Sequence, residues 1–361
     1  LFRSSTATPV KDVALADLAA TDLAIDKAAR AFESWKKVAP GDRAKLLRKF
    51  AAVIDSHIEE LAQLEVLNSG HTIGNARWEA GNVRDVLNYY SAAPERLFGK
   101  QIPVPNGIDI TFKEPLGVIG VIVPWNFPMP IAGWGFAPAL AAGNTVVLKP
   151  AELTPLSAIR IGELALEAGL PADVFTVIAG KGSVVGERFV TNPKVRKIVF
   201  TGSTEVGKKI MRGCADQVKR LTLELGGKSA NVIFADSDIE KAAAGAPGAV
   251  FDNAGQDCCA RSRLLVEKSV YEKFMSLFES AVKKFKVEDP KNESAEMGPL
   301  VSAQQLARVK EYVPENSKVA FQGSKPEGPG YWFAPTVLEV NDVNDRTYRE
   351  EIFGPVVSVI T

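Results

Sequence analysis

Two adjacent cysteines, Cys258 and Cys259, are the residues best suited to covalent chemistry in this chain. They are two of only three cysteines in 361 residues, and a Gly-Gln pair precedes them while the strand-like run 264–266 follows. A cysteine thiolate is a strong nucleophile, but a free cysteine in a large intracellular protein is often a small buried apolar residue. From these residues alone, a catalytic role and a packing role both stay open.

Two further polar residues stand where strand-like runs end. Asn126 lies in the proline-stiffened loop 124–128, where a neutral amide donor suits a developing oxyanion or simply holds a turn. Glu224 closes the run 221–223 and precedes two glycines, which leaves it room to move and an apolar setting, as a general base requires. The alternative for Glu224 is an ordinary surface carboxylate.

A second group of residues suits nucleotide binding. Lys149 and Glu152 follow a strand-like run, where the amine could donate to ribose hydroxyls and the carboxylate accept from them; otherwise they are a solvated strand end. The segment 202–208 lies between a predicted strand and a predicted helix, where free backbone N–H groups favour phosphate. It nearly matches a P-loop, but Lys209 leaves no hydroxyl for Mg²⁺, and a plain turn is the other reading.

Composition narrows the class of protein. Hydrophobic residues make up 46% and charged residues 24%, and the 43 basic and 43 acidic residues cancel, which predicts a globular protein of two or three domains that binds no nucleic acid. Three cysteines and no signal-peptide pattern favour the cytoplasm. The uncharged run 116–148 is interrupted by four prolines, which argues against a membrane span.

The chain has only two histidines, both in a helical region. A cysteine hydrolase needs a histidine beside its cysteine as the base, so the sequence argues against that class of enzyme.

These residues need a scaffold that brings strand ends together. Apolar spacing predicts helices over 21–97, with Asp42 as a cap, an alternating strand at 108–112 and a buried strand at 118–123. Strand and helix patterns then alternate, which is typical of an open parallel α/β sheet whose ligands gather at the carboxyl ends of the strands. The predicted strands here lie at 146–148, 174–178 and 197–200, and the predicted helices at 155–168, near 184 and from 203.

Taken together, these stretches resemble the aldehyde dehydrogenase superfamily over nearly the whole chain and in the expected order. The matching motifs are 124–128, 149–152, 200–207, 224–228, 255–259 and 351–355. The resemblance implies an α/β fold: a Rossmann-like NAD-binding domain (1–99 and 116–226), part of a β-hairpin oligomerisation arm (100–115) and an α/β catalytic domain (227–361). Because chains of the family usually continue well beyond the last motif, we expect the C-terminal part of the catalytic domain to be missing.

The resemblance also implies a role for each motif residue. Cys258 matches the nucleophile, with Cys259 as its packed neighbour, Glu224 matches the base that activates water, and Asn126 matches the oxyanion hole together with the backbone N–H of Cys258. Phe127, Trp134 and Asp257 fall at the substrate tunnel, where Asp257 attracts an ammonium group or merely positions the loop. The positions that match cofactor contacts are Trp125, Lys149, Glu152, Gly202, Ser203, Gly207, Leu225, Glu351 and Phe353.

The implied reaction oxidises a small aldehyde to a carboxylic acid with NAD through a thiohemiacetal and a thioester on Cys258. Glu224 argues for hydrolysis rather than transfer to coenzyme A, and Glu152 favours NAD over NADP. The implied assembly is a homodimer or homotetramer, with no metal and no membrane partner. Two alternatives stay open: a non-catalytic, truncated member of the fold that acts as a binding or structural protein, and a P-loop NTPase.

Overall fold

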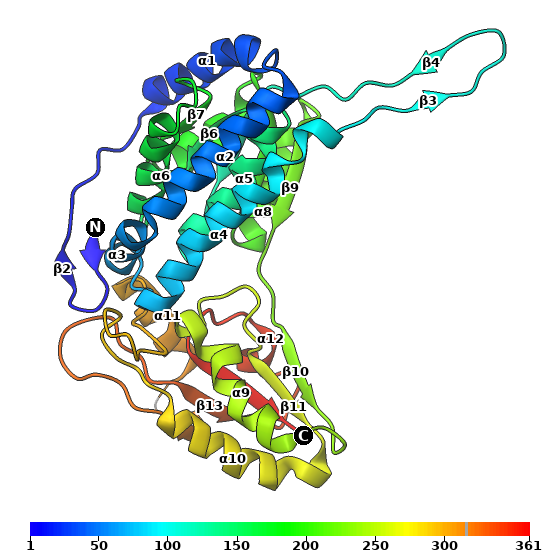
Figure 1. Ribbon diagram of the computed structural model, residues 1–361. Helices are drawn as coiled ribbons and strands as arrows, with labels where there is room; N and C mark the ends of the chain where they lie inside the picture. The colour runs from blue at the N-terminus through cyan, green and yellow to red at the C-terminus, as the bar shows by residue number, and fades with distance from the viewer. Residues whose placement is uncertain (315–316) are drawn as a thin grey trace. The chain divides into compact units, whose positions relative to one another are not determined.

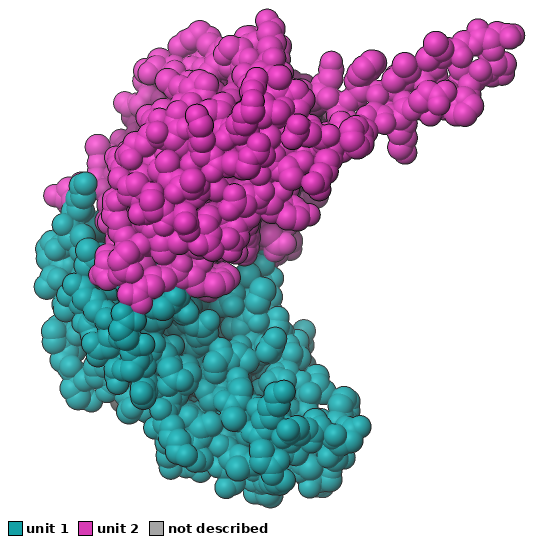
Figure 2. All heavy atoms as spheres, in the orientation of Figure 1, with its two compact units in different colours: residues 1–11, 65–76, 225–361 teal, residues 12–64, 77–224 magenta. Residues whose placement is uncertain are grey.

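The computed structural model describes residues 1–314 and 317–361, which form two compact units (Figures 1 and 2). Unit 1 contains residues 1–11, 65–76 and 225–361, and unit 2 contains residues 12–64 and 77–224. The boundary after Glu224 lies two residues before the predicted one, whereas 1–11 and 65–76 group with the C-terminal part of the chain. The functional names given to the two domains stay predictions.

Unit 2 is built on a sheet of five parallel strands in the order β7-β6-β5-β8-β9. Every residue of the central strand β5 is buried, because helices cover both faces of a parallel sheet and leave no side for polar residues. The predicted open parallel sheet is therefore confirmed. Its strands are β5 (Val118–Ile122), β6 (Thr145–Lys149), β7 (Phe175–Val177), β8 (Val195–Thr201) and β9 (Arg220–Glu224).

The helices of unit 2 bury an apolar core that includes Phe50, Phe136 and Phe175 in ring contact. The predicted cap at Asp42 is wrong, because α2 begins two residues earlier, at Pro40. Proline fits the first position of a helix, where its missing N–H costs no hydrogen bond. The helices that lie wholly in this unit are α1 (Leu18–Trp35), α2 (Pro40–Ser56), α5 (Pro128–Ala141), α6 (Leu156–Glu167), α7 (Glu187–Thr191) and α8 (Thr204–Ala215).

A long hairpin leaves the body of unit 2 after α4 (Ile73–Ser91). Only β3 (Gln101–Ile102) and β4 (Asp109–Ile110) pair in it, so the strand predicted over 108–112 is shorter than expected. Its side chains are exposed on both faces, and an isolated two-stranded ribbon has little apolar burial to extend its pairing. Ile108 and Phe112 are each 81% exposed at this hairpin.

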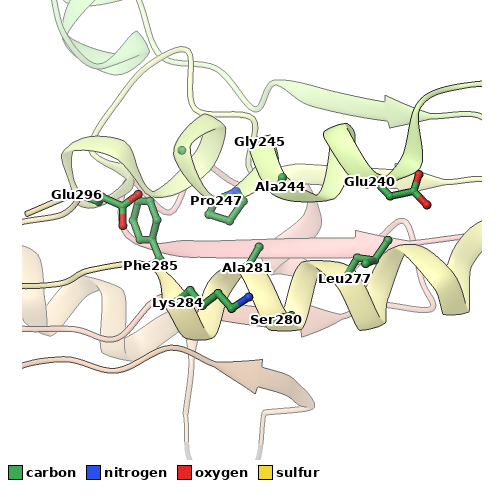
Figure 3. A pocket seen from close by; sticks show the side chains of 11 residues that line it. Glu240, Ala244, Gly245, Pro247, Leu277, Ser280, Ala281, Lys284, Phe285 and Glu296 are labelled. Carbon is green, nitrogen blue, oxygen red and sulfur yellow. The ribbon is translucent and has the colours of Figure 1, made fainter. Parts of the chain in front are cut away.

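Unit 1 contains a second five-stranded sheet in the order β10-β11-β14-β13-β12, parallel except for the edge strand β12. A groove of about 490 Å³ lies between two of its helices, where Ala244 and Pro247 face Leu277 and Ala281 (Figure 3). The strands are β10 (Ala230–Ile233), β11 (Arg263–Val266), β12 (Val319–Gln322), β13 (Thr336–Glu339) and β14 (Val356–Ile360). The helices are α9 (Ile239–Phe251), α10 (Tyr271–Lys284), α11 (Ala303–Tyr312) and α12 (Arg346–Arg349); α3 (Ile58–Asn68) and α4 contribute residues to both units.

Among the described residues, no helix is both long and apolar enough to cross a membrane. The uncharged run 116–148 forms β5, α5 and most of β6, which agrees with the prediction that its prolines break it into short pieces.

Candidate functional site

The carboxyl ends of the unit 2 strands place five of the predicted site residues along one edge of the sheet. Ile122, the last residue of β5, pairs with Lys149 and with Phe200, and Thr201 pairs with Glu224. The loop that carries Asn126 leaves the sheet directly after β5, and Gly202 and Ser203 follow β8. This edge is where open parallel sheets bind their ligands.

Lys149 and Glu152 tie the end of β6 to the loop after β7. The buried Nζ of Lys149 donates to the carbonyl oxygens of Pro150 (2.7 Å) and Gly180 (3.1 Å), so the reading as a solvated strand end is wrong for this residue. Burial lowers the pKa of Lys149, and the Glu152 carboxylate opposes that effect. Glu152 is exposed and accepts from the backbone N–H of Gly182 at 3.1 Å. Both residues therefore position the segment 180–182.

Gly182, at the end of that segment, lines a cavity of about 640 Å³, a size typical of small-molecule sites. Its walls combine apolar side chains with small residues, so a flat ring could enter between them. Ser203 caps the adjacent helix α8, with its hydroxyl accepting from the backbone N–H of Val206 at 3.4 Å. The residue pattern of 202–207 predicted the α8 end of this cavity, whereas its other wall was not predicted. The lining residues are Ile122, Gly182, Ser183, Gly186, Glu187, Val190, Thr191, Phe200, Val206, Lys209, Ile210 and Gly213.

The remaining predicted site residues of unit 2 differ in how deeply they are buried. Asn126 is buried, while Trp125 and Phe127 beside it are half-buried, and the carbonyl of Trp125 accepts from the Thr154 hydroxyl at 3.4 Å. Trp134 lies on α5, half exposed, and its indole N–H donates to Asn82 at 2.9 Å. Glu224 is exposed at the end of β9, so the apolar setting expected for it is wrong: the alternation of β9 points this side chain outward.

In unit 1, Cys258 and Cys259 occupy the centre of a turn that the backbone N–H of Ala260 closes on the carbonyl of Asp257 at 3.1 Å. Cys258 is half-buried and Cys259 is exposed. One oxygen of the Asp257 carboxylate accepts from the backbone N–H of Cys259 at 3.0 Å, which supports the loop-positioning role considered for Asp257. The turn therefore presents both thiols together.

Gln256 anchors this turn through its side chain, a role that was not predicted from the sequence. Its buried side chain donates to the carbonyl of Asn253 (3.0 Å) and accepts from the backbone N–H of Val301 (2.9 Å). Asn253, Ala254 and Gly255 all have positive φ, so the chain makes a left-handed turn shortly before Cys258. Such strained backbone is common at functional sites.

The segment around Glu351 and Phe353 packs directly on the cysteine loop. A Cβ at Gly255 would lie 2.1 Å from the carbonyl oxygen of Gly354, so only glycine permits this approach. The Glu351 carboxylate accepts from the backbone N–H of Gly227 at 3.0 Å. The structure thus brings Cys258, Asp257, Glu351, Phe353 and Leu225 into one unit, and the strand-end residues into the other.

The environment of Cys258 favours the protonated thiol. Burial, together with the neighbouring Cys259 thiol and the Asp257 carboxylate, raises the pKa of Cys258 to about 12. A nucleophilic attack by this sulfur therefore requires a base to remove its proton.

Lys228, at the end of the motif 224–228, is a charged residue with no predicted role. Its Nζ is buried with no hydrogen-bond partner among the described residues. Burial and the nearby Arg263 lower the pKa of Lys228 to about 8, although Glu351 opposes the shift. The feature of the sequence that could have indicated this buried lysine is its position after two glycines in an otherwise apolar run.

Comparison with known proteins identifies the family. A sequence profile of the aldehyde dehydrogenase family matches residues 2–361. Betaine aldehyde dehydrogenase of Bacillus subtilis is 40% identical over 350 residues, which cover 94% of this chain and 71% of that protein. Cytosolic 10-formyltetrahydrofolate dehydrogenase of Xenopus laevis is 40% identical over 367 residues, which cover 98% of this chain, so the chain spans 40% of that relative's length.

Solved structures agree with the profile. Betaine aldehyde dehydrogenase of Staphylococcus aureus in complex with NAD⁺ has a TM-score of 0.96 at 36% identity, covering 100% of this chain and 74% of that one. PnpE in complex with nicotinamide adenine dinucleotide also has a TM-score of 0.96, at 39% identity, covering 100% of this chain and 76% of that one. The chain belongs to the aldehyde dehydrogenase family.

Proposed function

We propose that this protein oxidises an aldehyde to a carboxylic acid, with NAD⁺ as the hydride acceptor and Cys258 as the nucleophile. The observation that carries the proposal is the turn that holds the Cys258 thiol, anchored by Gln256 and packed against the segment of Glu351 and Phe353. Family membership supplies the reaction class, and the turn supplies the reacting atom.

A dinucleotide fits the residues of unit 2. The apolar cavity between Gly182 and α8 suits an adenine ring, and the start of α8 offers backbone N–H groups to the pyrophosphate. Lys149 and Glu152 lie at the strand end where the adenosine ribose would bind, and Trp125, Gly202, Gly207 and, in unit 1, Leu225 are assigned cofactor contacts. Glu351 and Phe353 are assigned to the nicotinamide end. When bound, the cofactor accepts a hydride from the substrate carbon.

Three protein residues carry out the remaining steps of the reaction. The sulfur of Cys258 attacks the aldehyde carbon, and the thiol proton must leave during this step because burial keeps the thiol protonated. The Asn126 amide and the Cys258 backbone N–H stabilise the oxyanion of the thiohemiacetal. Glu224 removes a proton from water, which hydrolyses the thioester and releases the acid, and its exposure at the end of β9 leaves the side chain able to move.

The cofactor choice, the assembly and the location belong to the same proposal. The Glu152 carboxylate would repel a 2′-phosphate, which favours NAD over NADP. The exposed apolar residues of the hairpin, Ile108 and Phe112, are suited to pairing with a second copy in a homodimer or homotetramer. Three free cysteines are consistent with a cytoplasmic location.

The test is NADH formation by the full-length protein with an aldehyde. Cys258→Ser should abolish turnover, whereas Cys214→Ser should keep it, because Cys214 is a buried residue of α8 with no assigned role. Glu224→Gln should allow one burst of NADH and then stop, since the thioester forms but is not hydrolysed. Wild-type turnover by Cys258→Ser would refute the proposal.

The substrate class is tested by measuring NADH formation with a panel of aliphatic, aromatic, ω-amino and ω-carboxy aldehydes at a fixed NAD⁺ concentration. The two betaine aldehyde dehydrogenases among the relatives make a cationic aldehyde the first to try. Phe127 and Trp134 offer aromatic faces and Asp257 a negative charge, both of which attract an ammonium group. If Asp257→Asn raises KM for an ω-amino aldehyde and leaves KM for an aliphatic one unchanged, Asp257 contacts the substrate; equal effects assign it to the loop alone.

A further inference from the structure

Asp257, Cys258 and Cys259 together form a cluster of possible metal ligands. The two Sγ atoms are 3.8 Å apart, and one ligand atom from each of the three residues lies within 4.8 Å of the others. Neighbouring side chains in an extended chain point to opposite faces, but these two cysteines occupy the central positions of a turn, which brings their sulfurs to the same side.

The sulfur separation matches a tetrahedral metal site. Two thiolates at about 2.3 Å from Zn²⁺ with a tetrahedral angle between them are about 3.8 Å apart. A disulfide instead requires a sulfur separation of about 2.05 Å and Cα atoms about 4.4–6.8 Å apart, whereas the Cα atoms of adjacent residues are only about 3.8 Å apart. The two sulfurs can therefore bind one Zn²⁺ almost without moving, whereas a disulfide between them would require the backbone of the turn to distort.

The remaining requirements of a metal site are a third ligand, a rigid support and an entrance. Asp257 uses one carboxylate oxygen for the backbone N–H of Cys259, and its other oxygen can bind metal. Gln256 holds the turn through Val301 and Asn253. A cavity of about 200 Å³, lined in part by Asp257 and the exposed Cys259, gives an ion access from solvent.

We propose that Asp257, Cys258 and Cys259 bind Zn²⁺ or a similar thiophilic divalent cation, and that this ion reversibly inhibits the enzyme. Each thiol releases one proton to solvent as its sulfur forms a bond to the metal, and no oxidant or reductant is involved. Three protein ligands leave a fourth position for water. Because the Cys258 sulfur donates electron density to the ion and the ion blocks the approach of a substrate, attack of this sulfur on an aldehyde is suppressed.

The first test is zinc binding without substrate, so that it does not depend on the proposed dehydrogenase activity. Reduced protein is titrated anaerobically with Zn²⁺ against a chromogenic chelator. We expect one high-affinity ion per chain, a loss of more than about 100-fold in affinity for Cys259→Ser, and no loss for Cys214→Ser. Loss of one ligand should exceed the 10–100-fold loss that follows removal of an outer-shell partner.

The second test identifies the ligands in the wild-type protein. Co²⁺ should give the intense near-ultraviolet band of a sulfur-to-cobalt charge transfer, and Zn²⁺ should remove it. If NADH formation is then measured, micromolar Zn²⁺ should inhibit wild type, a chelator should restore activity, and Cys259→Ser should resist. Equal zinc affinity in the Cys258→Ser/Cys259→Ser double variant, or a cobalt spectrum without the sulfur band, would place the ion elsewhere and overturn the inference.

Discussion

Alkylation of Cys258 measures the protonation state on which the proposed mechanism depends. Burial, Cys259 and Asp257 raise its pKa from 9.0 to about 12. At pH 8, a thiol with a pKa of 9.0 is about one-tenth thiolate, whereas one with a pKa of 12 is about one part in ten thousand thiolate. Since the thiolate is the reactive form, iodoacetamide should modify Cys258 about 1000-fold more slowly than it modifies an ordinary thiol.

The assay follows carboxamidomethylation by mass spectrometry in the free protein between pH 7 and 10. Cys258 and Cys259 fall in the same tryptic peptide, 242–261, so fragment ions must assign the label to one or the other. The rate at Cys258 should rise about tenfold per pH unit without a plateau. Asp257→Asn removes a negative charge that raises the pKa, so it should increase the rate at pH 8, while Asp236→Asn, an exposed carboxylate outside this turn, should not. A plateau below pH 9 would show that the thiol ionises in its ordinary range and would refute this account of the site.

Three further predictions concern the supports of the cysteine loop. Gly255→Ala would place a Cβ 2.1 Å from a facing carbonyl oxygen, at a φ of +68°. The substitution should therefore destabilise unit 1 by about 2–4 kcal/mol and lower its Tm. The control is Gly245→Ala on α9, where the added Cβ meets open space, and it should be neutral or slightly stabilising. Gln256→Leu leaves the Val301 amide without its acceptor, at a cost of about 1–3 kcal/mol, and hydrogen exchange at that amide should speed up; unchanged exchange would contradict the anchoring role. The pKa of Lys228 is about 8 in the folded protein and 10.5 in the unfolded chain. Below pH 8 the buried charge therefore lowers the free energy of unfolding by up to about 3 kcal/mol, and this cost disappears as the pH rises to 10.5. Relative to the Tm of Lys228→Met, the Tm of the wild-type protein should therefore rise between pH 8 and 10.5.

The sequence predicted those features that depend on short-range pattern. Ser203 before an apolar-periodic segment correctly placed the start of α8, and the uncharged run around 118–123 correctly predicted a buried parallel strand. The edge that gathers Lys149 and Glu224 followed from the same alternation of strands and helices, because carboxyl ends of parallel strands share one side of the sheet.

The features missed depend on partners far away along the chain. Nothing near Gln256 indicates that its side chain will meet the Val301 amide, 45 residues later. Lys149 looks solvated until the carbonyl of Gly180 is placed beside it, and the exposure of Glu224 depends on the register of the whole edge strand. The helix near 184 was predicted, but its role as a wall of the cavity was missed, because residues 182–191 line that cavity only together with Ile122 and α8, which are distant or separate in the sequence pattern.

The contact between Gly255 and Gly354 also has a consequence for synthesis of the protein. These residues are 99 positions apart, so the ribosome needs about 5–20 s to make the segment that covers the cysteine turn. Until then the nascent chain carries two neighbouring thiols without the packing that buries Cys258. The growing polypeptide should therefore be most vulnerable to alkylating and oxidising compounds during this interval, before the enzyme exists as a folded molecule.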